Sequence, residues 1–204
     1  MLYKLQKKEI PKAGIILADA FQTDPLWNKI LEGEPNMDKK FQACFETPIR
    51  YCYKFGEVYA SSDNLEGIAG WISSQAPEMN FWSMIRSGAI FPAIRMGRNT
   101  LKKMGPIFEP IVKDRHENMK EKSYIYLLII GVAAKFQGRG FGGKIMQVLI
   151  EKCEKLGIHL YLETEVERNV EIYKRYGFKV IKQVTLPIVD HPMWEMIREA
   201  KVHN

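Results

Sequence analysis

One short stretch of the chain combines closely spaced glycines with basic side chains, a combination that can bind an anion. It reads Gln137-Gly138-Arg139-Gly140-Phe141-Gly142-Gly143-Lys144. Glycines let the backbone turn sharply and approach a ligand closely. An apolar run at 124–134 precedes the stretch and an amphipathic segment at 144–156 follows it, which predicts a strand, a turn and a helix in that order. The free N–H groups of the helix's first turn would then face a phosphate or pyrophosphate.

Two familiar phosphate loops fit this stretch only in part. Gly138, Gly140 and Gly143 satisfy the GxGxxG pattern of dinucleotide-binding folds, and Glu163 follows where a ribose-binding carboxylate would stand. In that fold the strand runs almost directly into the first glycine, whereas 134–137 intervene here, and too little chain follows for a second half-sheet. The stretch also fits GxxxxGK, but Ile145 stands where a P-loop needs Ser or Thr to bind magnesium.

A third interpretation explains more of the sequence. Gln137-x-x-Gly140-x-Gly142 after an apolar strand resembles the acyl-CoA pyrophosphate loop of the GNAT family of N-acetyltransferases, and Tyr173-Lys174-Arg175-Tyr176-Gly177-Phe178 resembles that family's Tyr-x-x-x-Gly-Phe segment. The stretches 161–164, 168–169 and 194–198 are similar to its puromycin N-acetyltransferase-like branch. Many of those relatives carry a histidine at the start of the central strand, where Tyr124 stands here. Without the resemblance, both motifs are simply turns in an α/β domain.

Periodicity predicts the elements that must position these motifs. In the second half, strands are expected at 123–133, 158–163, 178–185 and 193–198, with helices at 140–156 and 167–176. In the first half we expect early helices, a hairpin around 62–64 and a helical region at 77–104 that Gly105-Pro106 breaks. Alternating strands and helices favour an α/β (α+β) class with a mixed sheet.

The resemblance implies how these elements are arranged. It implies a GNAT fold in which helices flank a mixed central sheet, splayed between the 123–133 and 158–163 strands. A single domain would span 1–204, with 1–118 forming mainly the acceptor side and a helical insertion, and 119–204 forming the acyl-CoA-binding core. The acceptor pocket would come from the early helices and the 74–118 insertion.

The resemblance also implies acetyl-CoA as the cofactor. Its pantetheine arm would lie in the splay, paired with a strand bulge near 130–132. Backbone N–H groups of the glycine loop would hold the pyrophosphate, and the loop's two basic side chains either screen its charge or are simply solvated. Asn169 either contacts the cofactor or stabilises the start of a helix. The expected cofactor-binding residues are Ile130, Gly131, Val132, Gln137, Gly138, Arg139, Gly140, Phe141, Gly142, Gly143, Lys144 and Asn169.

Acetyl transfer to an amine needs a group that removes a proton and a group that protonates the departing thiolate. The resemblance assigns the acid to Tyr173, with Tyr176 on the same helix as the rival. Glu163 is the expected base, acting through a water. His116 and Glu109 remain alternatives, and the base is often water-mediated in this family.

Composition restricts the remaining possibilities. The chain has 204 residues, and Lys plus Arg (30) exceed Asp plus Glu (24) to give a net charge of +6. Three cysteines without metal-ligand spacing, together with the absence of a long apolar run, predict a cytoplasmic protein with no metal and no membrane span. No basic tract interleaved with aromatics suggests nucleic acid. We therefore expect an acetyltransferase that modifies a primary amine of a small molecule in a ternary complex; the alternative is a non-catalytic acyl-CoA sensor. The sequence does not specify an oligomeric state.

Overall fold

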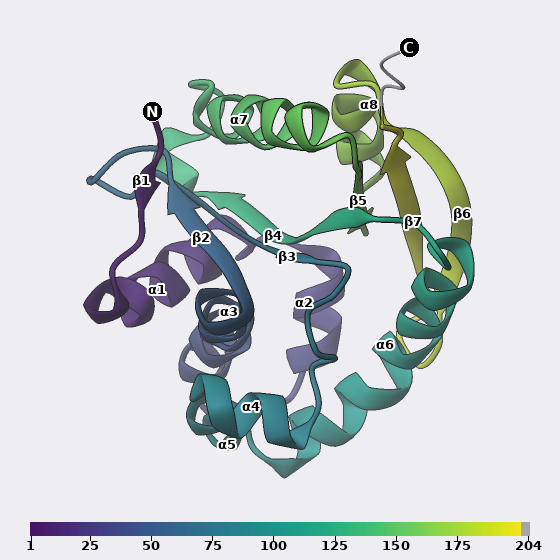
Figure 1. Cartoon of the computed structure of the whole chain (residues 1–204). Helices are drawn as coiled ribbons and strands as arrows, with labels where there is room; N and C mark the ends of the chain where they lie inside the picture. Colours follow the sequence, from purple (N-terminus) through teal and green to yellow (C-terminus); the bar gives the residue numbers. More distant parts are fainter. Residues whose placement is uncertain (201–204) are drawn as a thin grey trace.

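Helices cover both faces of one curved sheet in the computed structural model, which describes residues 1–200 (Figure 1). The strands are β1 (Tyr3–Lys4), β2 (Gly56–Ala60), β3 (Gly67–Ser73), β4 (Tyr124–Val132), β5 (His159–Thr164), β6 (Lys179–Leu186) and β7 (His191–Arg198). The α-helices are α1 (Ile10–Ala20), α2 (Pro25–Leu31), α3 (Met37–Phe55), α4 (Phe81–Ser87), α5 (Ile90–Met96), α6 (Arg98–Asn118), α7 (Phe141–Leu156) and α8 (Glu167–Arg175). Two short 3₁₀ turns, η1 (Lys7–Glu9) and η2 (Ala134–Phe136), join them.

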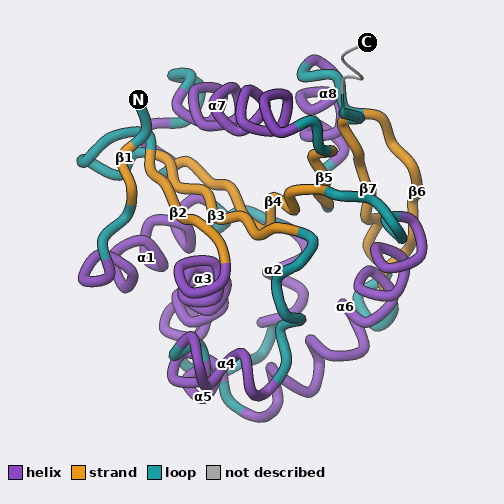
Figure 2. Tube along the Cα trace, in the orientation of Figure 1, coloured by secondary structure: helices purple, strands orange, loops and turns teal. Residues whose placement is uncertain are grey.

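The seven strands follow the order β1-β2-β3-β4-β5-β7-β6, and only β4 and β5 run parallel. Figure 2 shows this sheet with α7 and α8 on one side and with α1 and α3 on the other. Each side has its own apolar core. One contains buried residues of α1 and α3, and the other contains buried residues of α7. This arrangement confirms the expected mixed sheet flanked by helices, and all four strands predicted for the second half are present.

The sheet opens between β4 and β5. Their register pairs run only from Tyr124–His159 to Tyr126–Tyr161. Beyond Tyr126, β4 continues along β3, and beyond Tyr161, β5 continues along β7. Backbone groups on the facing edges of the two strands are therefore not used for pairing with each other, which confirms the expected splay.

The bulge in β4 lies earlier than 130–132. Its register against β3 shifts between Gly70, opposite Ile129, and Trp71, opposite Leu127, so that Leu128 is the extra residue. Gly131 instead allows close packing, because a Cβ there would come within 2.8 Å of a methyl group of Leu17 on α1. The bulge expected near 130–132 is therefore present in β4 but lies at Leu128, and Gly131 serves contact between a helix and the sheet instead.

Gly105-Pro106 does not break the chain either, because α6 runs through it and through Pro110. A proline removes one helical hydrogen bond, but Gly105 and Pro106 lie on the exposed side, where water can satisfy the freed carbonyl. Ile107 and Ile111, four residues apart, are buried in the core. Burial of this face outweighs the local cost and keeps the helix continuous, and α6 consequently becomes one wall of the cavity described below.

Candidate functional site

The glycine loop joins the end of β4 to the start of α7. Gly138 and Gly140 have φ angles of 75° and 83°, a conformation that side chains with a Cβ rarely adopt. Gly140 is the N-cap of α7, and its carbonyl accepts the first helical hydrogen bond, from Lys144 N at 2.9 Å. Within the described part of the chain, nothing accepts a hydrogen bond from the N–H groups of 138–143. The loop thus presents a run of donors at the positive end of a helix dipole.

The side chains around this loop have individual roles. Gln137 Nε2 donates to the carbonyl of Val132 at 3.1 Å, closing the loop over the end of β4. Lys144 Nζ donates to the carbonyl of Ser61 at 2.6 Å, so its charge is tied to the β2–β3 hairpin. The guanidinium of Arg139 lies 5.7 Å from the ring centre of Phe136. Arg139 and Lys144 were both predicted to face a phosphate. In the described structure Lys144 is bound to a carbonyl, whereas Arg139 has no carbonyl or carboxylate partner.

These features fit a coenzyme A pyrophosphate. An added Cβ at Gly138 or Gly140 would meet nothing within 4 Å, so a ligand can approach the backbone there. The donors are backbone amides of consecutive residues, which suit phosphate oxygens, and no group of metal-ligating side chains occurs in the described residues. Ile130 to Val132 border the opening between β4 and β5, where the rest of such a ligand would lie.

A cavity of about 640 Å³ reaches the splay between β4 and β5. It is bounded by β4 and β5 at its inner end and by α2, α3 and α6 at its outer end. Tyr173, Glu163 and Asn169, the side chains predicted to do chemistry or hold the cofactor, all line it. The structure thus brings together residues from one strand and one helix, β5 and α8, that the sequence separates by up to ten positions. Neither His116 nor Glu109 lies in its lining.

Tyr173 extends from α8 into this cavity. Its ring packs against Phe178 with centroids 5.7 Å apart, and within the described residues its hydroxyl makes no hydrogen bond. Burial, with the nearby Glu165 as a second cause, raises the pKa of this phenol above its usual value. The hydroxyl therefore stays protonated at neutral pH. Tyr176 differs, because its hydroxyl lies against α7, where a Cβ on Gly143 would approach it to 2.8 Å.

Glu163 belongs to a network of buried polar groups on β5. Tyr126 donates to its Oε2, and Tyr161 donates to its Oε1 at 2.9 Å. Arg115 Nη1 lies 3.7 Å from Oε1. Burial raises the pKa of this carboxyl, although Arg115 and the two phenols oppose that shift. Glu163 is consequently held in one orientation at the splay.

The network continues through Tyr161 to β7. The Tyr161 hydroxyl also lies 3.0 Å from Glu195 Oε2, which accepts a hydrogen bond from Asn118 Nδ2 at 3.0 Å. Glu163 and Glu195 are register partners on adjacent strands. A hydroxyl has one proton to donate, so it serves one of the two carboxylates at a time.

Glu165 is a site residue that the sequence analysis missed. It lines the cavity two residues after Glu163, at the turn from β5 into α8. Burial and the neighbouring Asp24 raise the pKa of its carboxyl to about 8. Asp24 in turn caps α2, accepting from Leu26 N at 2.9 Å. Period-two spacing from Glu163 was the available signal, since alternate strand residues share one face.

Other expected residues lie at the edges of the site. Asn169 Nδ2 is 3.4 Å from Thr164 Oγ1, a contact that links the first turn of α8 to the end of β5. His116 is exposed and forms a 2.9 Å contact with Glu78, away from the splay. Tyr124 stands at the start of β4 with its ring 6.0 Å from that of Tyr161.

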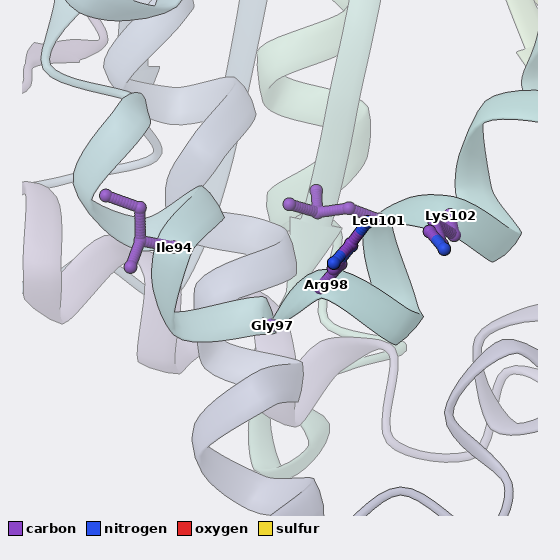
Figure 3. A pocket seen from close by; sticks show the side chains of 5 residues that line it. All are labelled: Ile94, Gly97, Arg98, Leu101 and Lys102. Atoms are coloured by element: carbon purple, nitrogen blue, oxygen red, sulfur yellow. The ribbon is translucent and has the colours of Figure 1, made fainter.

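A second, shallow hollow lies on the outer side of α5 and α6. Figure 3 shows Ile94 on one side and Arg98, Leu101 and Lys102 on the other. Leu101 also lines the large cavity, so the hollow adjoins its outer wall. No helix among residues 1–200 is long and apolar enough to span a bilayer.

Comparison with known proteins agrees with this geometry. Residues 107–178 match the sequence model of the Acetyltransferase (GNAT) family. An uncharacterised N-acetyltransferase of Schizosaccharomyces pombe is 26% identical over 208 residues, which cover 98% of this chain and 84% of the relative.

Solved structures share the fold along the whole chain. A protein of Corynebacterium glutamicum described as histone acetyltransferase HPA2 and related acetyltransferase matches with a TM-score of 0.64 at 16% identity, over 100% of this chain and 98% of that one. Arylalkylamine N-acetyltransferase 2 of Aedes aegypti matches with a TM-score of 0.62 at 11% identity, over 98% and 99%. The family match spans β4, the glycine loop, α7, β5 and α8, the elements that carry the site. The chain therefore shares the fold of the GNAT acetyltransferases and matches that family's sequence model over residues 107–178, which supports an acetyl-CoA-dependent acetyltransferase.

Proposed function

We propose that this enzyme transfers the acetyl group of acetyl-CoA to a primary amine of a small molecule by direct attack in a ternary complex. The main support is that three side chains suited to proton transfer line one cavity at the splay. They are the phenol of Tyr173, whose hydroxyl has no hydrogen-bond partner among the described residues, and the carboxyl groups of Glu163 and Glu165. The three cysteines, Cys44, Cys52 and Cys153, are buried, and burial raises the pKa of each thiol. That argues against a thiolate nucleophile and for direct transfer.

The chain's own residues would hold the reactants. Acetyl-CoA, when bound, supplies the acetyl group as a thioester. Backbone N–H groups from 138 to 143 hold its pyrophosphate, with Arg139 and Lys144 adding positive charge. The backbone of Ile130, Gly131 and Val132 borders the pantetheine arm, and Asn169 lies beside it.

Proton transfers would be divided between two side chains. Glu163 takes the proton that the ammonium group loses, through a water molecule, and the nitrogen lone pair then forms the new N–C bond. As the C–S bond breaks, the Tyr173 hydroxyl gives its proton to the sulfur, and the second proton that the nitrogen loses on forming the amide passes to the Tyr173 phenolate through water. Glu163 then gives its proton to solvent, so that both groups return to their starting state. Tyr126, Tyr161 and Arg115 are positioning residues, since they hold Glu163.

The wider assignments follow from the same elements. We infer that 1–118 form the acceptor side and 119–204 the acyl-CoA-binding core of a single domain in the puromycin N-acetyltransferase-like branch. Stretches similar to that branch fall on paired strands, with Glu163 opposite Glu195. Three free, buried thiols suit a reducing compartment, which supports a cytoplasmic location.

The test combines cofactor binding with turnover. Calorimetry should detect acetyl-CoA binding without NADH binding, and a thiol-release assay should detect turnover on part of an amine panel. Glu163→Gln should lower kcat by roughly 100-fold or more, the usual contribution of a general base, with the affinity for acetyl-CoA retained. Acetyl-CoA binding without turnover on any amine would instead favour an acyl-CoA sensor.

A further inference from the structure

The charged side chains that line the large cavity either form one chain of ion pairs that ends at Glu163 or lie at the inner end beside it. Among the described residues that line it, Glu78, Arg115, Glu163 and Glu165 are the ones with charged side chains. Arg115 lies 3.3 Å from Glu78 and 3.7 Å from Glu163, so its positive charge is already shared between two carboxylates. It is also buried against the ring of Tyr126, 4.5 Å from the ring centre. The lining therefore has three carboxyl groups and one guanidinium, so acidic groups outnumber basic ones.

Glu165 is the carboxyl group of this set without a cationic partner. Its carboxyl group is influenced by Asp24 and Glu163 and lies near the phenol of Tyr173, and no ion pair joins it to a basic side chain of the described structure. The ring of His191 contacts the backbone carbonyl of Glu165, at 3.0 Å. A carboxylate in this surrounding is costly unless a cation compensates it. An ammonium group of the acceptor would supply that compensation beside Tyr173 and Glu163, where the reaction takes place.

The outer part of the cavity has the opposite character. Three aromatic rings form its floor: Trp27 lies 4.9 Å from Phe45 and 5.9 Å from Phe108, measured between ring centroids. Methionines supply much of the remaining wall, and their flexible side chains adapt to ligands of different shape. The methionines of this wall are Met79, Met84, Met96 and Met104.

We propose that the acceptor is a monoamine whose body is a long or bulky apolar group, with its ammonium beside Glu165 and its apolar body between α2, α3 and α6. This inference rests on the proposed function and specifies its substrate class. A polyamine or an amino acid would fit poorly, because a second charge in the outer part would lose its water without gaining a partner.

The first experiment is a thiol-release assay on amines of graded length. For unbranched alkylamines from butylamine to decylamine, kcat/KM should rise about threefold to fourfold for each added methylene until the cavity is filled. Tryptamine should be acetylated well, and agmatine and spermidine poorly. A preference for agmatine or spermidine over octylamine, or no dependence on chain length, would overturn the inference while leaving the acetyltransferase function intact.

Two variants test the location of the apolar body. Val112 lines the cavity on α6 and is 37% exposed, so Val112→Lys should fold normally. It should reduce kcat/KM for octylamine at least tenfold and for butylamine much less. Met104→Lys, deeper in the same wall, should do the same more strongly. Ile94→Lys is the control, since Ile94 is 67% exposed and lies on the outer hollow of Figure 3 without lining this cavity. Equal losses for the long and the short amine in Val112→Lys would contradict the placement.

A binding measurement separates this inference from the proposed function. Calorimetry of octylamine against the enzyme saturated with CoA, which has no acetyl group to transfer, should give saturable binding that Val112→Lys weakens. Octylamine binding without turnover on any amine would retain the apolar amine site and reject catalysis. Turnover on other amines without octylamine binding would retain catalysis and reject the site.

Discussion

Tyr126 and Tyr161 are the last paired residues of β4 and β5, and both phenols donate hydrogen bonds to Glu163. Their rings lie 5.5 Å apart in an edge-on arrangement. The point where the sheet opens is therefore also the point where a carboxylate is fixed. Two aromatic side chains thus set both the opening for the cofactor and the position of the proposed base.

Replacing the proposed acid should slow the chemical step alone. Tyr173→Phe removes the hydroxyl that no described residue binds, so kcat should fall by roughly 100-fold or more while the affinity for CoA changes little. Tyr176→Phe, three residues further along, is the matched control and should stay within about threefold of the unaltered enzyme. Stopped-flow thiol release and calorimetry of CoA would measure the two effects. A larger loss in Tyr176→Phe than in Tyr173→Phe would reverse the assignment.

The pH dependence should report on Glu165. Because the pKa of its carboxyl is raised to about 8, the carboxylate that attracts the ammonium forms as pH rises through this value. For octylamine, kcat/KM should therefore increase between pH 7 and pH 9, chiefly through a lower KM. Glu165→Gln should raise KM and flatten this limb. An unchanged profile in that variant would exclude Glu165 from acceptor binding.

The same carboxyl should make the fold sensitive to pH. Its pKa is about 8 in the folded chain against 4.5 for an ordinary glutamate, so between these values the folded chain binds more protons than the unfolded chain. The free energy of unfolding therefore falls as pH rises through this window. Glu165→Gln should raise Tm more at pH 9 than at pH 5. Glu167→Gln, exposed at the start of α8, should show no such difference.

The glycine loop has space for an added methyl group, but its backbone has a positive φ angle that residues with a Cβ rarely adopt. Gly140→Ala places a methyl group in open space, yet φ there is 83°, which costs about 1 kcal/mol or more. A shift of the loop away from this conformation should weaken CoA binding at least tenfold. Gly33→Ala is the matched control, with a φ of 74° and equally open surroundings far from the site. It should lose similar stability and keep its affinity for CoA, as calorimetry and thermal unfolding would measure.

Gly131 tests packing within the sheet. Gly131→Ala brings a methyl group to 2.8 Å from Leu17 and 3.1 Å from Ala20, and such overpacking should cost about 1–3 kcal/mol. Gly142→Ala should be tolerated, since its nearest neighbour, Val132, would be at 3.5 Å. Urea denaturation measures both. Equal stability of the two variants would mean that α1 can move away from β4.

Local patterns were sufficient for the elements near the site. The apolar run of β4, the glycines before α7 and the alternation after Gly157 each encode structure through neighbours in the chain. The order of these elements along the chain also linked the glycine loop and the Tyr173 segment to the same predicted fold. The break expected at Gly105-Pro106 failed because burial of Ile107 and Ile111 outweighs a local hydrogen bond.

What the sequence determined by itself was the glycine loop proposed to bind the cofactor, because a loop of this kind and its helix are built from consecutive residues whose backbone angles depend on local glycines. What only the tertiary structure decided was the cavity proposed to bind the acceptor. This cavity is assembled from α2, α3, α6 and two strands, and the importance of Glu165 depends on Asp24, which lies 141 positions earlier. Burial and the surrounding charges set the chemistry of such a side chain, and both arise from contacts between residues that are distant in the chain.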